Sequence, residues 1–69
     1  MKKIVAFGVD LRVPQWARYA AKDDDGQVWI YEEKPLLTGG KWLADKGNCI
    51  KVMRQYPSIL NERDLIERV

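Results

Sequence analysis

The side chains of this chain that could do chemistry are concentrated in one segment, residues 16–35. The segment holds two of the three tryptophans and two of the three tyrosines, around the turn sequence Asp23-Asp24-Asp25-Gly26. Carboxylates at such a turn could serve acid–base chemistry, and the aromatic rings could stack on a planar ligand. The chain has no histidine, however, so it cannot form a Ser–His or Cys–His nucleophile pair.

Acid–base chemistry by carboxylates alone is also disfavoured by their spacing. Neighbouring residues of a strand, such as Glu32 and Glu33, point to opposite faces, and acidic residues at a turn tip are typically solvated. The turn does not match a calcium-binding EF-hand loop, because Ala21 stands where the first ligand belongs and Ile30 and Tyr31 stand where later ligands belong. We therefore expect no enzymatic activity, no metal site and no cofactor.

The aromatic residues favour one binding hypothesis. Three aromatic side chains share a face if the segment is a hairpin, which resembles the platforms that stack single-stranded bases. Between positions 41 and 54 the basic residues are opposed only by Asp45 and could contact phosphates. The residues of this nucleic-acid hypothesis are Tyr19, Trp29, Tyr31, Lys41, Lys46, Lys51 and Arg54. In so short a domain we favour the competing interpretation, in which this face is the core, covered by a C-terminal helix or by Trp42.

The opposite face of the same hairpin favours a second hypothesis. Trp16, Arg18 and Lys34 are expected on it, with acidic and basic neighbours of mixed sign. Mixed charge makes a poor track for phosphates, but Trp and Arg are residues that often anchor protein interfaces. We therefore assign these three residues to a protein-binding surface.

The turn chemistry sets the register of the hairpin that must position these side chains. A three-residue loop of Asp24, Asp25 and Gly26, with the glycine in a left-handed conformation, is a common hairpin closure. The strand pairs that it predicts are Tyr19 with Tyr31, Ala21 with Trp29, Ala17 with Glu33, Arg18 with Glu32, and Trp16 with Lys34. A two-residue Asp25-Gly26 loop is the alternative, and it would set Ala20 against Tyr31 and Lys22 against Trp29.

The remaining elements follow from periodicity and from breaking residues. Alternating apolar residues predict a first strand near residues 3–11, which Pro14 ends. We expect a loop over 35–47, a short strand over 49–54, and a C-terminal helix near 61–68 that begins with a side-chain cap.

These elements predict one α+β domain spanning residues 1–69. We expect an antiparallel sheet of three or four strands with the hairpin at 16–34 and the short C-terminal helix, and a closed SH3-like β-barrel is the alternative topology. The predicted core consists of Val5, Phe7, Val9, Leu11, Ile30, Trp42, Ile50, Val52, Leu65 and Ile66.

Composition limits the setting in which the protein works. The net charge is +2, which is too small to indicate a nucleic-acid partner by itself. No segment approaches the roughly 20 apolar residues of a membrane span, so we expect no membrane partner. Cys49 is the only cysteine and reads as a small apolar strand residue. This usage and the lack of a signal-like start are typical of a cytoplasmic protein.

One motif resembles a known group of proteins. It reads Pro14-x-Trp16-Ala17-x-Tyr19-Ala20-Ala21-x-Asp23-x-Asp25-Gly26-x-Val28, then Tyr31-Glu32-x-Lys34-Pro35 and Trp42. Across positions 14–43 the chain is similar to small, mostly uncharacterised accessory proteins encoded by tailed bacteriophages and prophages. The strand expected before the motif is longer here than in that pattern. The resemblance implies an accessory protein that acts by binding a host or phage macromolecule, and it transfers no catalytic residue.

These observations lead to one functional expectation and one alternative. We expect a non-enzymatic phage or prophage accessory protein in the cytoplasm of the host cell, which binds and modulates a host or phage protein. The alternative is a small nucleic-acid-binding module that uses the hairpin aromatics and the basic residues. A homodimer formed through an exposed edge strand is a further possibility.

Overall fold

A computed structural model describes residues 1–55 and 66–69 of the chain, and all the regular structure in these residues is β-strand. Every strand pairing is antiparallel. The strands are β1 (Lys2–Ala6), β2 (Val9–Val13), β3 (Tyr19–Lys22), β4 (Gln27–Tyr31), β5 (Leu36–Thr38), β6 (Lys41–Leu43), β7 (Cys49–Arg54) and β8 (Ile66–Arg68). The expected α+β class is therefore wrong, and residues 1–55 and 66–69 form an all-β structure.

The central sheet contains four strands in the order β7-β4-β3-β8. The predicted hairpin forms its middle, and its register is confirmed by the pairs Tyr19 with Tyr31 and Ala21 with Trp29. The three-residue loop is also confirmed, because the N–H of Asp23 donates to the carbonyl of Gln27 at 2.8 Å. Gly26 has a φ of 92° there, a conformation that glycine adopts without strain.

The hairpin is shorter at its open end than predicted. Strand β3 begins at Tyr19, and residues 15 and 16 form a turn in which the N–H of Ala17 donates to the carbonyl of Pro14. The predicted pairs of residues 16–18 with residues 32–34 are therefore wrong. Pro14 fixes its own φ and favours a turn at this point, so the chain enters the central sheet only at Tyr19, after Trp16.

The N-terminal segment is a second hairpin rather than one long strand. Ala6 pairs with Val9, and Phe7 and Gly8 form the loop with φ values of 50° and 76°. Positive φ at both loop residues is the signature of a type I′ turn, which matches the twist of the two strands. The fold at Gly8 changes which residues face inward: Ala6 and Val13 are buried, whereas Val5 is 62% exposed.

Residues 36–43 form a third hairpin where a loop was expected. Strands β5 and β6 pair Leu36 with Leu43 and Thr38 with Lys41, and Gly39 and Gly40 form the loop with φ values of 56° and 81°. Two glycines between short apolar runs are a hairpin signal, which the expectation of a loop over 35–47 does not take into account.

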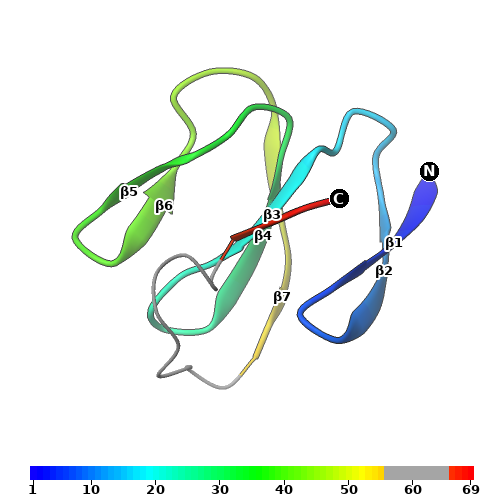
Figure 1. Ribbon diagram of the computed structural model, residues 1–69, viewed down its shortest axis with the longest axis horizontal. Helices are drawn as coiled ribbons and strands as arrows, with labels where there is room; N and C mark the ends of the chain where they lie inside the picture. Colours follow the sequence, from blue (N-terminus) through cyan, green and yellow to red (C-terminus); the bar gives the residue numbers. More distant parts are fainter. Residues whose placement is uncertain (56–65) are drawn as a thin grey trace.

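The β1–β2 and β5–β6 hairpins lie on opposite sides of the central sheet (Figure 1). Side chains alternate along β3 and β4, which gives the sheet two faces. We call the face with Ala20, Lys22, Val28 and Ile30 the core face and the face with Tyr19, Ala21, Trp29 and Tyr31 the pocket face. The core face packs on the β1–β2 hairpin. The buried residues of this cluster are Ala6, Val13, Ala17, Ala20 and Ile30.

The C-terminal helix predicted near 61–68 is wrong for residues 66–68, which form a strand. Strand β8 occupies the free edge of β3 and pairs Ala20 with Glu67 and Ala21 with Ile66. Sheet pairing satisfies backbone groups that a helix as short as the predicted one would leave partly unpaired. The part of the predicted helix at 61–65, including Leu65, lies outside the described residues. The alternative SH3-like closed barrel does not match either, because the strands form three separate sheets.

The predicted core was right only in part. Ile30 is fully buried as expected, whereas Val5 and Ile50 are 62% and 44% exposed. The half-buried members of the predicted set are Phe7, Val9, Leu11, Trp42, Val52 and Ile66. The error at Val5 follows from the turn at residues 7 and 8, because the predicted single strand put Val5 in the inward-facing row.

Candidate functional site

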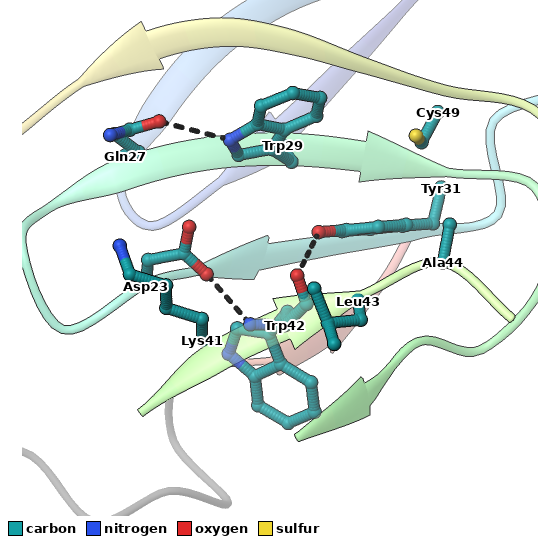
Figure 2. Close-up of a pocket in the computed structure, with 9 residues that line it drawn as sticks. All are labelled: Asp23, Gln27, Trp29, Tyr31, Lys41, Trp42, Leu43, Ala44 and Cys49. Carbon is teal, nitrogen blue, oxygen red and sulfur yellow. Dashed lines mark hydrogen bonds between the residues drawn. The ribbon is translucent and has the colours of Figure 1, made fainter. Parts of the chain in front are cut away.

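A concave site among the described residues lies on the pocket face, between the central sheet and the β5–β6 hairpin (Figure 2). It has a volume of about 340 Å³, at the lower end of the range of about 300–1,000 Å³ that small-ligand sites occupy. The lining residues are Asp23, Gln27, Trp29, Tyr31, Lys41, Trp42, Leu43, Ala44 and Cys49. We call this site the aromatic pocket because three of its walls are Trp29, Tyr31 and Trp42.

Trp29 and Tyr31 reach the pocket because of the alternation along β4. Val28 and Ile30 point to the core face and are fully buried, so the residues between and after them point to the pocket face. The ring nitrogen Nε1 of Trp29 donates to Oε1 of Gln27 at 3.3 Å (Figure 2). This bond holds the indole along the wall of the pocket and leaves the ring half-buried.

Trp42 docks the β5–β6 hairpin against the sheet through its own polar atoms. Its backbone N–H donates to Oδ1 of Asp23 at 2.8 Å, and its Nε1 donates to the carbonyl of Lys22 at 2.9 Å. The hydroxyl of Tyr31 donates to the carbonyl of Trp42 at 3.1 Å, and the N–H of Asp24 donates to the carbonyl of Gly40. These bonds set the distance between the hairpin and the sheet and therefore the width of the pocket.

The acidic turn lies at one end of the pocket. Hydrogen bonds order its side chains more than those of a solvated turn tip. Asp23 is only 7% exposed, and only Asp24 of the three acids is exposed. Asp25 accepts bonds from the backbone and side-chain nitrogens of Gln27, and Nζ of Lys41 lies 3.7 Å from its Oδ2. The pKa of Asp25 is held below its usual range, mainly by the Gln27 backbone bond, with smaller contributions from the Gln27 side chain, Lys41 and Arg54.

The pKa of Tyr31 is shifted by the burial of its phenol in the pocket wall. Burial raises the pKa of its phenol well above the ordinary value, and the nearby negative charge of Asp23 adds to the increase. Tyr31 therefore stays neutral and keeps its hydroxyl proton for the bond to Trp42.

One basic residue, Lys41, lines the aromatic pocket, and two more lie on the adjoining strand β7. Lys51 lies directly across from Trp29 in the β4–β7 pairing, and Arg54 lies across from Gln27 and donates from Nε to the carbonyl of Asp25. Lys41, Lys51 and Arg54 are exposed. The register shift between Val28 and Trp29 against β7 is a β-bulge, which bends a strand locally and lies beside the pocket.

No family model, curated protein or solved structure matches this chain. The physical character of the sites therefore carries the functional argument.

The structure brings together only part of the predicted nucleic-acid set. Trp29, Tyr31 and Lys41 line one pocket, with Lys51 and Arg54 beside them on the adjoining strand. Tyr19 pairs with Tyr31 and is half-buried, but it does not line the pocket. Lys46 is exposed in the connection between β6 and β7 and does not line it either. The preferred interpretation of this face as core covered by Trp42 is right at Tyr31, which is 2% exposed and bonded to Trp42. It is incomplete at Trp29, which is half-buried and borders an open pocket.

The predicted protein-binding set is not one uniform surface. Trp16 is half-buried and packs against the core cluster, so its ring is largely occupied. Arg18 and Lys34 are exposed. Lys22, on the core face of the same hairpin, is 7% exposed with its Nζ 4.9 Å from the centre of the Phe7 ring.

Several pocket residues belong to neither of the two predicted binding sets. They are Asp23, Gln27, Trp42, Leu43, Ala44 and Cys49. The sequence signal that could have found some of them is the Gly39-Gly40 turn, which folds Trp42 back toward the sheet. Within the described residues there is no group of three His, Cys, Asp or Glu side chains that could hold a metal ion. The same part of the chain contains no helix of the length and apolar character needed to cross a membrane.

Proposed function

We propose that this protein is a non-enzymatic module that binds single-stranded nucleic acid, with one base in the aromatic pocket and the phosphates along the neighbouring basic residues. The observation that carries the proposal is the geometry around Trp29. Its half-buried ring borders an open pocket of about 340 Å³, and exposed Lys51 lies directly across from it on β7. Stacking surfaces beside cations are what sequence-tolerant single-strand binders use.

The chemistry of each part supports this function. Every base has an aromatic face, and stacking on one side chain contributes about 1–3 kcal/mol per base. Lys41, Lys51 and Arg54 are exposed around the site and can approach phosphates, which are the main source of affinity for nucleic acids. The resemblance of the motif to phage and prophage accessory proteins supports placing this binding in an infected or lysogenic cell.

The test is binding of a fluorescently labelled, mixed-sequence single-stranded oligonucleotide, measured by anisotropy at several salt concentrations. We expect affinity to fall steeply with salt, and Trp29→Ala to weaken binding roughly 5- to 150-fold. Lys51→Ala should reduce the salt dependence by about the contribution of one phosphate contact. Lys34→Ala is the matched control, because Lys34 is exposed but does not line the pocket, and it should leave the salt dependence unchanged.

The position of binding has an independent readout. Cys49 is the only cysteine, is exposed and lines the pocket, so its rate of labelling by a maleimide reports on access to the site. Bound oligonucleotide should slow this labelling. The proposal fails if no binding is detected even at low salt, or if Lys34→Ala weakens binding as much as Lys51→Ala does.

Protein binding is the second candidate, and one observation favours it. Leu36 and Leu43 face each other across β5 and β6, and they are 56% and 53% exposed. An exposed apolar pair on a protruding hairpin is suited to a protein contact. Replacing both leucines by serine should then abolish binding of the partner protein. Arg18→Ala tests the surface predicted from the sequence. It is less disruptive than Trp16→Ala, because Trp16 packs on the core.

A further inference from the structure

Most polar groups of the aromatic pocket form hydrogen bonds with other protein groups, so few of them can bond to a ligand. Gln27 uses Oε1 to accept from Trp29 and Nε2 to donate to Asp25 at 2.8 Å. The hydroxyl proton of Tyr31 goes to the carbonyl of Trp42. Both N–H groups of Trp42 are used, in bonds to Asp23 and to the carbonyl of Lys22. The O–H of Tyr31 and the ring N–H groups of Trp29 and Trp42 are therefore occupied, and Gln27 has used one of its two amide N–H donors.

Asp23 offers a carboxylate oxygen that the described residues leave free. Its side chain is more than nine-tenths buried, and only Oδ1 accepts a hydrogen bond from the described residues, from the N–H of Trp42. No fully buried side-chain oxygen or nitrogen of the described part of the chain lacks a partner, so Oδ2 keeps access to solvent. Figure 2 shows this second oxygen turned away from Trp42, and Asp23 lines the pocket. The exposure that Asp23 retains is therefore to the pocket.

The lysine that lines the pocket pairs with a different carboxylate. Lys41 also lines the pocket, but its Nζ lies 3.7 Å from Oδ2 of Asp25. The described residues form no salt bridge with Asp23. A carboxylate oxygen that has no cationic partner forms strong hydrogen bonds with N–H donors of a ligand. The pocket is thus an aromatic slot with a carboxylate at one end.

We propose that the aromatic pocket selects guanine among the bases of a single strand, with the Asp23 carboxylate accepting from adjacent N–H groups of the base. This inference rests on the proposed function. Guanine presents a ring N–H beside an exocyclic amino group, so that the free Oδ2 of Asp23 can accept from both. Adenine and cytosine present an amino group beside a ring nitrogen that is itself an acceptor, and thymine presents one N–H between two carbonyls. Each of these would set a lone pair against Oδ2.

The surrounding charges favour a base over a protein side chain. The guanidinium of an arginine offers a similar pair of donors and could also stack on Trp29. Exposed Lys41, Lys51 and Arg54 around the pocket repel such a cation, whereas they attract the phosphates attached to a base. A nucleotide satisfies both the carboxylate and its basic neighbours.

The experiment compares thymidine nonamers that carry one central guanine, hypoxanthine, adenine or cytosine. We expect the guanine oligonucleotide to bind tightest, by about tenfold or more over adenine and cytosine, because a hydrogen bond to a charged group is lost and an acceptor is left unpaired. Hypoxanthine keeps the ring N–H but lacks the amino group, so its affinity should fall between guanine and adenine.

Asp23→Asn tests the assigned residue, and Asp24→Asn is its matched control. The asparagine oxygen can still accept from Trp42, while its amide nitrogen replaces the free acceptor by a donor. The ratio of guanine to adenine affinity should fall to about one or below in Asp23→Asn. Asp24→Asn makes the same charge change at an exposed neighbour and should keep the ratio. Far-ultraviolet circular dichroism checks that both variants retain the sheet.

The outcomes separate this inference from the proposed function. Equal affinity for all four oligonucleotides, or an unchanged ratio in Asp23→Asn, overturns the base selection while nucleic-acid binding stands. If no oligonucleotide binds, the proposed function fails and the inference fails with it. Protection of Cys49 from maleimide by arginine amide alone, at a concentration at which a guanine nucleotide gives no protection, would overturn it in favour of a guanidinium ligand.

Discussion

The carboxylate Oδ1 of Asp23 accepts a hydrogen bond from the backbone N–H of Trp42 at 2.8 Å. The bond joins the tip of the β3–β4 hairpin to β6, across 19 residues of sequence. With the Trp42 bond to Lys22 and the Tyr31 bond to Trp42, it attaches the third hairpin to the sheet. The motif residues Asp23, Tyr31 and Trp42 therefore have a structural role in addition to lining the pocket.

Trp42→Phe should destabilise the protein by about 1–3 kcal/mol, because the carbonyl of Lys22 loses its donor in a partly buried position. Urea unfolding followed by circular dichroism measures this, since it does not depend on tryptophan fluorescence. Trp29→Phe is the control, because its indole bonds to a side chain at 3.3 Å and should cost less than about 1 kcal/mol. Equal costs for the two variants would contradict the docking role of Trp42.

Tyr31 should make stability sensitive to alkaline pH. Its pKa in the folded protein is raised above the ordinary value by burial, so the folded state holds the proton more tightly than the unfolded state does. The stabilisation that this provides is complete below the ordinary tyrosine pKa of about 10 and is lost as the pH rises above it. The free energy of unfolding, measured from pH 8 to 11.5, should fall at the alkaline end.

Tyr31→Phe separates this contribution from other ionisations. The variant should lose about 0.5–1.5 kcal/mol at neutral pH with the Trp42 bond, and its alkaline slope should be shallower than that of the unmodified chain. Tyr19→Phe changes a half-buried tyrosine outside the pocket and should keep the slope. An alkaline slope that Tyr31→Phe leaves unchanged would show that other groups cause it.

Gly40→Ala should cost more stability than Gly39→Ala. Both glycines have positive φ, 81° and 56°, so either alanine is strained by about 1 kcal/mol or more. A Cβ at Gly40 would also meet the carboxylate of Asp24, whose N–H bonds to the carbonyl of Gly40, whereas the space around Gly39 is open. Thermal unfolding of the two variants measures the difference, and a larger loss for Gly39→Ala would contradict this geometry.

Val13→Ala should be the more damaging of two valine substitutions in the N-terminal hairpin. Val13 is fully buried, so removing its methyl groups costs about 2 kcal/mol and lowers Tm by roughly 8–16 °C. Val5 is 62% exposed, and Val5→Ala should change stability by less than about 0.5 kcal/mol. Calorimetry of both variants measures the two costs. A large loss of stability in Val5→Ala would instead agree with the single long strand expected from the sequence, which places Val5 in the core.

Local patterns were sufficient to predict two elements. The acidic turn with Gly26 correctly set Tyr19 against Tyr31, and the bounds of the strand Cys49–Arg54 were predicted as the structure has them. Both depend on turn chemistry and alternation within a few residues. The same alternation failed at Phe7 and Gly8, because the row of apolar residues continues through a turn that only Gly8 signals.

The sequence by itself determined the β3–β4 hairpin, its loop and the absence of histidine-based chemistry, because these follow from residue types and near neighbours. Only the tertiary structure decided that Asp23 and Trp42 meet, that Trp29 borders an open pocket, and that Ile66 to Arg68 pair as a strand. These contacts join distant parts of the chain, such as Phe7 and Glu67, which are 60 residues apart. Such contacts depend on how the hairpins pack on the two faces of the sheet, and packing is a property of the whole fold.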